Sequence, residues 1–278
     1  MFNTDAVATE LIAARDATTI EASAAPVPTS SGVMAVPGNV VSKLSRGVSL
    51  TDGQLALLVS AALFVVSAWP LALTEVPPYQ DLPNHLAAVT VIEHPERYPE
   101  FVFNGFWKTN AALFAWLYVV GKVTGAKLAA RLFALLVLAA NAFVLPRVVL
   151  AFTGSRKRML VASLFMWPMV HNWFVSMGML DFALAVPLSL GLLVALDRQR
   201  RSPTLGNGVL VAALGAVTWY AHVFPLLVVH MLVGIEALQR RTWRERFATA
   251  RAMLLPLAPI TALVTLSLYQ HLNDTVGP

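Results

Sequence analysis

Long apolar runs, separated by short clusters of basic residues, are the feature that most limits how this chain can fold. The first run, residues 54–75, is long enough as a helix, at about 1.5 Å per residue, to cross a hydrocarbon core of about 30 Å. Only 13% of the residues are charged and 57% are hydrophobic, whereas about a quarter of the residues of a soluble domain are charged. The pattern therefore predicts an all-α integral membrane protein.

Charge and cysteine usage exclude several classes of function. The formal net charge of +5 could favour nucleic acid, but the basic residues stand in short clusters between apolar runs, which is typical of cytoplasmic loops. Nucleic acid is therefore not an expected partner. The chain has no cysteine, which excludes disulfides, thiolate metal sites and cysteine nucleophiles.

Residues 1–50 are expected to be a disordered tail on the cytoplasmic side of the membrane. They are rich in Ala, Thr, Ser, Val and Pro and show no sustained amphipathic period. Lys43 and Arg46 precede the first apolar run, and such basic residues favour the cytoplasm. The basic start and directly following apolar core of a cleaved signal peptide are missing, so the first run should remain as an anchor.

Residues 51–278 are predicted to form one polytopic module with about seven transmembrane helices and a non-cytoplasmic C-terminus. The run 110–124 is shorter than the roughly 20 residues that a span needs, and counting it would place the later basic clusters outside. We therefore expect an interfacial or re-entrant helix there, within an external loop covering 76–125. The predicted spans are 54–75, 126–151, 159–177, 180–196, 205–221, 223–238 and 252–269.

The external loop contains the polar stretch 79–86, with the sequence Tyr-Gln-Asp-Leu-Pro-Asn-His-Leu. It places a carboxylate, an amide and an imidazole close together, at Asp81, Asn84 and His85. Asp81 can cap a helix that begins at Leu82. Alternatively, Asp81, with His85 one helical turn further on, is a general base or metal ligand facing a lipid-borne substrate. The sequence leaves both interpretations open.

Under the predicted topology, four further polar residues reach the same outer face: His171, Asn172, Asp181 and His222. Asp181 either caps the helix that begins at Phe182 or faces the bundle or a water-filled cleft, because a carboxylate in lipid is costly. Each histidine is either a hydrogen-bonded interface residue or a substrate contact. The convergence of these groups predicts a substrate site at this face.

Four basic residues break the positive-inside pattern on the outer side, namely Lys108, Lys122, Lys127 and Arg131. They either extend their charges to lipid headgroups or bind the phosphate of a lipid in the outer leaflet. The second interpretation makes Lys122, Lys127 and Arg131 candidates for stabilising a departing phosphate group.

Three segments resemble polytopic GT-C glycosyltransferases, and in particular uncharacterised bacterial membrane proteins of that type. Segment 79–87 is similar to the start of their first external loop, 171–182 to a segment before the fourth span, and 219–222 to a hairpin with a histidine. The likeness covers roughly residues 54–269. It implies a seven-helix module in the bacterial plasma membrane, an active site facing away from the cytoplasm, and a polyprenyl-phosphate-linked sugar as donor.

The resemblance also implies roles for the two aspartates. In such enzymes the first-loop aspartate takes the proton of the acceptor, a role that would fall on Asp81. An acidic residue of the second loop assists or holds a metal, which would be Asp181, although the similar proteins tend to carry an amide there. Such enzymes usually continue into further helices, so a chain ending at Pro278 is expected to be a truncated or minimal form.

The residues suit this chemistry independently of the resemblance. Displacing a polyprenyl phosphate needs a base for the acceptor hydroxyl and positive charge for the departing phosphate. Asp81 is the candidate base, with His85 or His222 hydrogen-bonded to it or to the phosphate. A divalent cation, Mg or Mn, is the cofactor considered, but two carboxylates and histidines of unknown separation do not define a coordination sphere.

Two other classes of function remain open. One is a transporter or flippase for a lipid or polar solute, in which the same groups would form a relay at the midplane. The other is a non-catalytic membrane scaffold. A glycosyltransferase is favoured because the ionisable groups gather at one face and the spans lack paired, glycine-interrupted segments.

Overall fold

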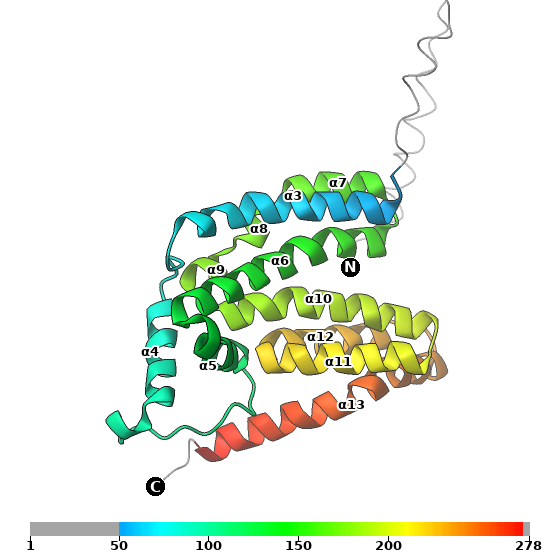
Figure 1. Ribbon diagram of the computed structural model, residues 1–278. Coiled ribbons are helices and arrows are strands. Elements are labelled where there is room, and N and C mark those ends of the chain that lie inside the picture. The colour runs from blue at the N-terminus through cyan, green and yellow to red at the C-terminus, as the bar shows by residue number, and fades with distance from the viewer. Residues whose placement is uncertain (1–49, 275–278) are drawn as a thin grey trace, which may run out of the picture. The chain divides into compact units, whose positions relative to one another are not determined.

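The structure is a computed structural model that describes residues 50–274, and the side chains of residues 50–269. The described part consists of α-helices and one 3-10 helix, with no strand among these residues, as Figure 1 shows. The all-α prediction is therefore confirmed for this part of the chain. The predicted N-terminal tail lies outside the described residues.

Four helices are long and apolar enough to cross a membrane, which is compatible with the predicted membrane protein. Three begin within two residues of the predicted spans, and the last begins well before its predicted start at residue 252. The Thr242 side chain caps the start of that helix, ahead of the apolar run, by accepting from the Glu245 N–H at 3.2 Å. The four are α3 (Asp52–Leu73), α6 (Ala126–Thr153), α10 (Leu180–Arg201) and α13 (Trp243–Asp274).

Two further apolar helices match the predicted boundaries but are shorter. They are α11 (Leu205–Ala221) and α12 (Val223–Leu238), of 17 and 16 residues. At about 1.5 Å per residue, each spans roughly 25 Å, which is less than the hydrocarbon core of about 30 Å. The described residues therefore hold four to five membrane-length helices, and the predicted count of about seven is not confirmed.

The predicted span 159–177 is not one straight helix. It is divided into α7 (Arg156–Leu164), α8 (Trp167–Val170) and α9 (Trp173–Met177), and the chain bends by 68° between α7 and the α8–α9 pair. Pro168 lies in the first turn of α8, which favours a new helix start. The Asn172 side chain then caps α9 by accepting from the Val175 N–H, at 3.2 Å. These local signals interrupt the helix predicted over 159–177. The segment can therefore cross a membrane only as a bent span.

The predicted external loop holds α4 (Leu82–Glu93), the 3-10 helix η1 (Pro95–Arg97) and α5 (Ala112–Thr124). The 13 residues of α5 extend about 20 Å, too little to cross a membrane. Only Gly125 separates α5 from α6, and the Trp116 indole N–H donates to the Ala129 carbonyl at 2.9 Å. The two helices therefore form a tight hairpin, which fits the predicted interfacial or re-entrant helix.

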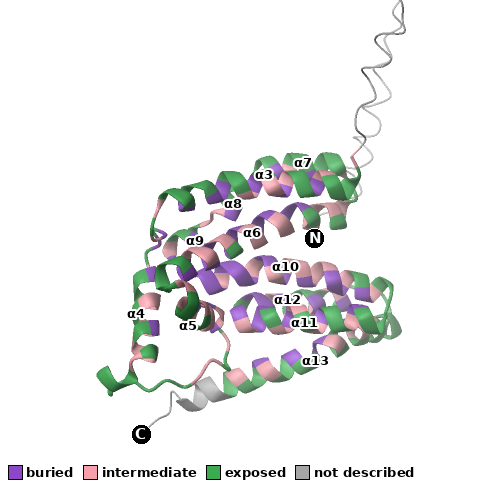
Figure 2. Ribbon diagram, viewed as in Figure 1, coloured by how far each residue is buried: buried purple, intermediate pink, exposed green. Residues whose placement is uncertain are grey.

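Helices α6 and α10 lie at the centre of the helical packing. Half of the apolar window of each is buried, against 28% for α3 and 22% for α13, and Figure 2 shows the same contrast. The Asn141 amide of α6 donates to the Ala183 carbonyl of α10 at 3.1 Å, across an otherwise apolar contact. A second apolar cluster joins α10 to α11, α12 and α13 around Leu192 and Leu257. The outer faces of α3 and α13 stay exposed and apolar, as expected for helices that contact lipid.

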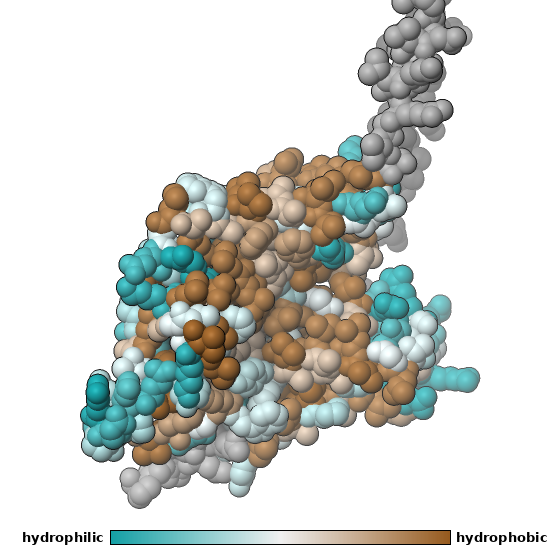
Figure 3. All heavy atoms as spheres, viewed as in Figure 1, coloured by the Kyte–Doolittle hydropathy of each residue, from teal (hydrophilic) through white to brown (hydrophobic). Residues whose placement is uncertain are grey.

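Polar groups collect towards the two ends of the long helices. On the face drawn in Figure 3, hydrophobic side chains cover the middle and hydrophilic ones gather at both ends. At one end Arg156 pairs with Asp52, and Phe152 shares a small cavity with Arg200 and Glu236. The ends of α6, α10 and α12 that carry basic clusters therefore lie together. The segments that carry the predicted site lie at the other end (Figure 1).

Candidate functional site

The polar stretch 79–86 and the segment 171–182 are in direct contact. The Gln80 N–H donates to the Ser176 carbonyl at 3.2 Å, and the Asp81 N–H donates to the Met177 carbonyl at 2.9 Å. Both carbonyls belong to the end of α9, where a helix leaves its last carbonyls without partners. The backbone of the polar stretch therefore completes the end of α9 and is held against it.

Gly178 makes this close approach feasible. Its φ of +86° lies in the left-handed region, and a Cβ placed on it would lie 3.0 Å from the Asp81 nitrogen and 3.1 Å from the Leu82 nitrogen. Both atoms are backbone and cannot turn aside, so a side chain at position 178 would push the two segments apart. The glycine thereby sets the position of Asp81.

Asp81 occupies the N-cap position of α4, but its side chain makes no capping hydrogen bond. Its φ of −91° and ψ of −5° are close to helical, whereas a capping residue usually has an extended backbone. Its carboxylate is half-buried and forms no hydrogen bond or ion pair with the described residues. The capping role predicted as one alternative for Asp81 is therefore wrong, and the carboxylate remains free for another partner.

His85 lies one turn along α4 from Asp81, and its N–H donates to the Asp81 carbonyl at 3.2 Å. The imidazole packs edge-on against Phe114 of α5, with 5.3 Å between ring centroids. Burial lowers the pKa of His85 below its usual value, while the nearby Gly178 carbonyl and Asp81 carboxylate act in the opposite direction. The imidazole is therefore mainly neutral at pH 7 and can exchange hydrogen bonds with a substrate.

The lowered pKa of His85 predicts that acid destabilises the folded protein. The unfolded chain takes up a proton at His85 as the pH falls through about 6.5, whereas the folded protein resists protonation. The folded state should therefore lose stability from about pH 6.5 downwards. Thermal unfolding midpoints at pH 7.5 and 5.5 should differ less in a His85→Gln variant than in the original protein. Equal differences in both proteins would contradict this assignment.

Asp181 is buried, with 9% of its surface exposed, and its role is structural in this structure. Its Oδ1 accepts a hydrogen bond from the Leu113 N–H at 2.7 Å, in the first turn of α5. The N-cap residue of α5, Ala111, has no side chain that could do this. Asp181 therefore caps α5, which is 68 residues away, rather than the helix at Phe182 as one interpretation of the sequence predicted.

Removing the Asp181 carboxylate should destabilise the protein. An Asp181→Ala variant leaves the buried Leu113 N–H without a partner and should lower the free energy of unfolding by about 1–2 kcal/mol. Asp181→Asn keeps an acceptor oxygen and should lose less. Thermal unfolding of both variants in the same detergent measures the difference. An Asp181→Asn variant that loses activity at unchanged stability would instead indicate a direct catalytic role.

The third resembling segment, 219–222, joins the same end. The Thr109 hydroxyl donates to the Trp219 carbonyl at 2.7 Å, and the Ala111 N–H donates to the Tyr220 carbonyl at 3.2 Å. His222 caps α12, since its Nδ1 accepts from the Phe224 N–H at 3.1 Å. Its ring packs edge-on against Phe182, with centroids 5.1 Å apart. The segment 109–111 thus connects the end of α11 to the start of α5.

The remaining predicted polar residues differ in their surroundings. Asn172 uses both ends of its amide locally, because it caps α9 and donates to the Met169 carbonyl at 3.0 Å. His171 is half-buried, and its ring centroid lies 6.2 Å from that of Tyr79. Asn84 is exposed on α4. His171 lines a cavity.

This cavity, of about 450 Å³, lies between α3, residues 78–79 and the α8–α9 turn. Three hydroxyls among its lining residues, those of Ser67, Thr74 and Tyr79, are buried without a hydrogen-bond partner in the described part of the chain. Burial raises the pKa of Tyr79 to about 12. Unpaired buried hydroxyls are uncommon, which makes this cavity a candidate for a polar ligand group. Sequence reasoning missed Ser67, a buried polar residue of the apolar helix α3 that lines this cavity.

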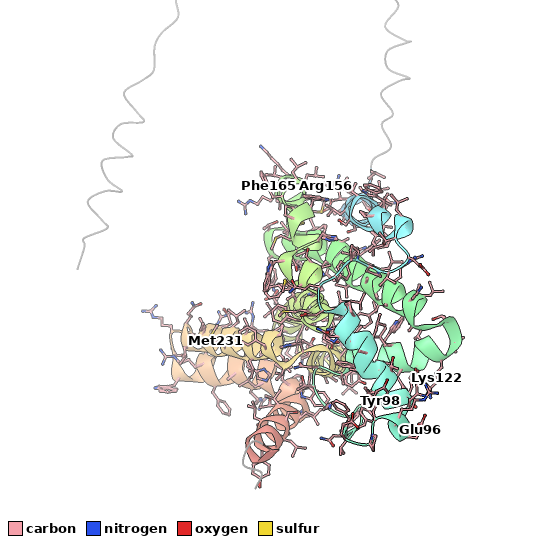
Figure 4. All side chains as sticks on the ribbon, turned by 90° about the vertical axis from the view of Figure 1, so that its left-hand side faces the viewer. Glu96, Tyr98, Lys122, Arg156, Phe165 and Met231 are labelled. Atoms are coloured by element: carbon pink, nitrogen blue, oxygen red, sulfur yellow. The ribbon has the colours of Figure 1, made fainter. Side chains whose placement is uncertain are left out.

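Two of the three candidates for the phosphate contact, Lys127 and Arg131, make structural contacts instead. Lys127 pairs with Glu75 at 2.6 Å, which lowers the pKa of that carboxyl group. The Arg131 guanidinium donates to the carbonyls of Thr74 and Glu75. Both side chains therefore fasten the segment that leaves α3. Lys122 instead lies over the ring of Tyr118 on the same helix, 3.8 Å from its centroid, and projects from the periphery in Figure 4.

The described residues do not fit the divalent cation that the sequence analysis considered as a cofactor. No group of three His, Cys, Asp or Glu side chains within residues 50–274 is arranged to hold a metal ion. The Asp181 carboxylate is buried and already accepts from the Leu113 N–H. A Mg or Mn site needs several converging oxygen ligands, so no step is assigned to a metal here.

Comparisons with known proteins identify no protein that is similar to this chain. No family model, no curated protein and no solved structure matches this chain. The resemblance to GT-C enzymes thus depends on three short segments. These segments contact one another at one end of the helices, through the backbone bonds at Asp81 and the packing of His222 on Phe182.

Proposed function

We propose that this protein is a GT-C-like membrane glycosyltransferase, or a catalytically reduced relative, that uses a polyprenyl-phosphate-linked sugar. The single observation that carries the proposal is the free carboxylate of Asp81, held by backbone bonds where segments 79–86 and 171–182 meet. A carboxylate at a helix N-terminus that neither caps nor pairs is available to accept a proton. The active end would face away from the cytoplasm of a bacterial plasma membrane.

The proposed topology has seven spans. It adds the bent α7–α9 segment, α11 and α12 to the four membrane-length helices. The chain then alternates sides from a cytoplasmic N-terminus, with α4 and α5 in the external segment. All basic clusters at the ends of α6, α10 and α12 then lie on the cytoplasmic side, as the positive-inside rule expects.

In the proposed reaction Asp81 is the general base. Its carboxylate takes the proton of the acceptor hydroxyl while the acceptor oxygen forms a bond to the anomeric carbon of the sugar. The bond from that carbon to the phosphate oxygen breaks, and the polyprenyl phosphate leaves with the electron pair. His85, neutral and one turn away, positions the acceptor or the Asp81 carboxylate by a hydrogen bond.

Asp181 contributes indirectly in this scheme. By capping α5 it fixes the helix whose Phe114 packs against the His85 ring. Positioning of this kind accounts for a large part of enzymatic rate enhancement. Asp181 is thus proposed as a positioning residue rather than a second acid.

The departing phosphate needs a cation nearby. Lys127 is paired with Glu75, and Arg131 is bonded to backbone carbonyls, whereas Lys122 forms no ion pair with the described residues. Lys122 is therefore the proposed contact of the donor phosphate at the membrane surface.

The proposal is tested by measuring products. The purified protein in liposomes is given labelled polyprenyl-phosphate sugars with hexose or pentose groups, together with a panel of hydroxyl-bearing acceptors, and free polyprenyl phosphate is quantified. An active enzyme releases it, and a reduced relative binds a donor without releasing it. Neither release nor binding across the donor panel would overturn the proposal. Movement of intact donor between leaflets would instead indicate the flippase.

A further inference from the structure

A basic cavity lies at the end of the helices opposite Asp81. It has a volume of about 990 Å³ and is lined by the end of α10, the turn between α12 and α13, and the start of α13. Four arginines contribute to its lining, which are Arg200, Arg240, Arg244 and Arg251. The carboxylate in the lining, that of Glu245, is used in the capping box that starts α13, where it accepts from the Thr242 N–H at 3.4 Å.

The charges of two of these arginines are already matched. Arg200 pairs with Asp197 at 2.8 Å, and Arg240 pairs with Glu236. Arg244 and Arg251 form no ion pair with any described residue. They are seven residues apart on α13, so they lie on the same face, two turns from each other. The cavity thus presents two guanidinium groups that form no ion pair, with one carboxylate, that of Glu245, in the same lining.

A second observation points to a ligand that accepts hydrogen bonds. The Nε of Arg240 is buried and has no hydrogen-bond partner in the described part of the chain. Guanidinium groups are matched in geometry to phosphate oxygens and bind them through paired hydrogen bonds. The cavity therefore combines unmatched positive charge with an unused buried donor.

An apolar groove continues from this cavity along the helices. It has a volume of about 490 Å³, lies between α11 and α13, and shares Gln199, Pro203, Leu255 and Pro256 with the cavity. Leu205 and Leu255 in its walls are largely exposed, with 86% and 68% of their surfaces accessible. The face of α13 thus changes from arginine to leucine within about three turns.

We propose that the cavity and groove together bind an anionic phospholipid. The phosphodiester lies between Arg244 and Arg251, and one acyl chain covers Leu205, Val209 and Leu255 in the groove. Basic pockets between membrane helices bind acidic headgroups in this way. A zwitterionic lipid would bring its own cation towards the arginines, and inorganic phosphate would leave the groove uncovered. The site is at the other end from Asp81, so it is independent of the proposed enzymatic function.

The test measures thermal unfolding of the purified full chain in a neutral detergent. Phosphatidylglycerol should raise the unfolding midpoint by roughly 5 °C near saturation, because a ligand that binds the folded state stabilises it. Phosphatidylcholine and inorganic phosphate at the same concentration should leave the midpoint unchanged. An equal rise with phosphatidylcholine would overturn the charge argument, and an equal rise with phosphate would overturn the lipid assignment.

Variants locate the effect. Arg244→Gln with Arg251→Gln should weaken the apparent affinity for phosphatidylglycerol at least about tenfold, since both phosphate contacts are lost. The matched control is Arg198→Gln with Arg241→Gln, which removes the same charge from exposed positions outside the cavity lining. Leu255→Gln should weaken binding of the long-chain lipid. Equal effects of the two arginine pairs would show that only net charge matters and would overturn the site.

If the Arg244→Gln, Arg251→Gln variant does not fold, the salt dependence of lipid binding by the unaltered protein tests the same contacts. Raising the ionic strength should reduce the stabilisation by phosphatidylglycerol, because salt screens exposed charges. A stabilisation that does not respond to salt would contradict phosphate binding by these arginines.

Discussion

Replacing Asp81 by asparagine is expected to lower the rate of sugar transfer by about two to four orders of magnitude, the usual contribution of a general base. The amide has nearly the same shape as the carboxylate but cannot take the acceptor proton. Structure should be retained, because the bond to the Met177 carbonyl comes from the backbone N–H and no capping bond is lost. Release of polyprenyl phosphate at saturating donor measures the effect.

The matched control for this variant is Glu93→Gln. Glu93 is an exposed carboxylate at the other end of the same helix, α4. Its replacement removes the same charge from the same external segment and should leave the rate unchanged. Transfer that survives Asp81→Asn would remove Asp81 from the mechanism, while unfolding of Asp81→Asn would show that the carboxylate has a structural role.

Replacing Gly178 by alanine should produce the largest loss of stability, about 2–5 kcal/mol. Holding a non-glycine residue at a φ of +86° costs about 1–2 kcal/mol. The added Cβ would lie 3.0 Å from the Asp81 backbone nitrogen, and such overpacking typically costs about 1–3 kcal/mol more. For a protein of this size the unfolding midpoint should fall by roughly 10 °C.

Gly154→Ala separates the two causes of this loss. Gly154 is also left-handed, with a φ of +59° and a ψ of +15°, but a Cβ there would meet no atom within 4 Å. It should therefore show only the backbone cost, about 1–2 kcal/mol. Gly178→Ala should also reduce sugar transfer, because the displaced backbone carries Asp81. Equal destabilisation by both variants would mean that the contact between residues 178 and 81 contributes nothing.

The sequence predicted helices well where the relevant signals are local. Segments 205–221 and 223–238 are helical with the predicted boundaries, because each apolar run follows a residue that caps it. Thr204 accepts from the Asn207 N–H and His222 from the Phe224 N–H. By contrast, the run 159–177 contains helix-breaking residues, Pro168 and Asn172, but its high overall hydropathy led to the prediction of one continuous span.

The candidate site was less accessible to sequence reasoning. The polar stretches were expected to share one face, but the atoms that join them are mostly backbone atoms, which carry no residue-specific signal. The two aspartates illustrate the difficulty. Each could have capped the helix that follows it, yet Asp81 caps nothing and Asp181 caps α5. Whether an aspartate caps a helix depends on which backbone N–H groups from distant parts of the chain lie within hydrogen-bonding distance of its carboxylate.

The amino-acid sequence by itself determined the all-helical class, the long apolar helices and most of their starting residues, because hydropathy and capping act over a few residues. Only the tertiary structure decided which polar groups are free and which are used. Gly178 brings two segments into backbone contact, Asp181 is taken by the Leu113 N–H, and the Asp81 carboxylate remains unpaired. These outcomes depend on contacts between residues tens of positions apart, which no local pattern encodes.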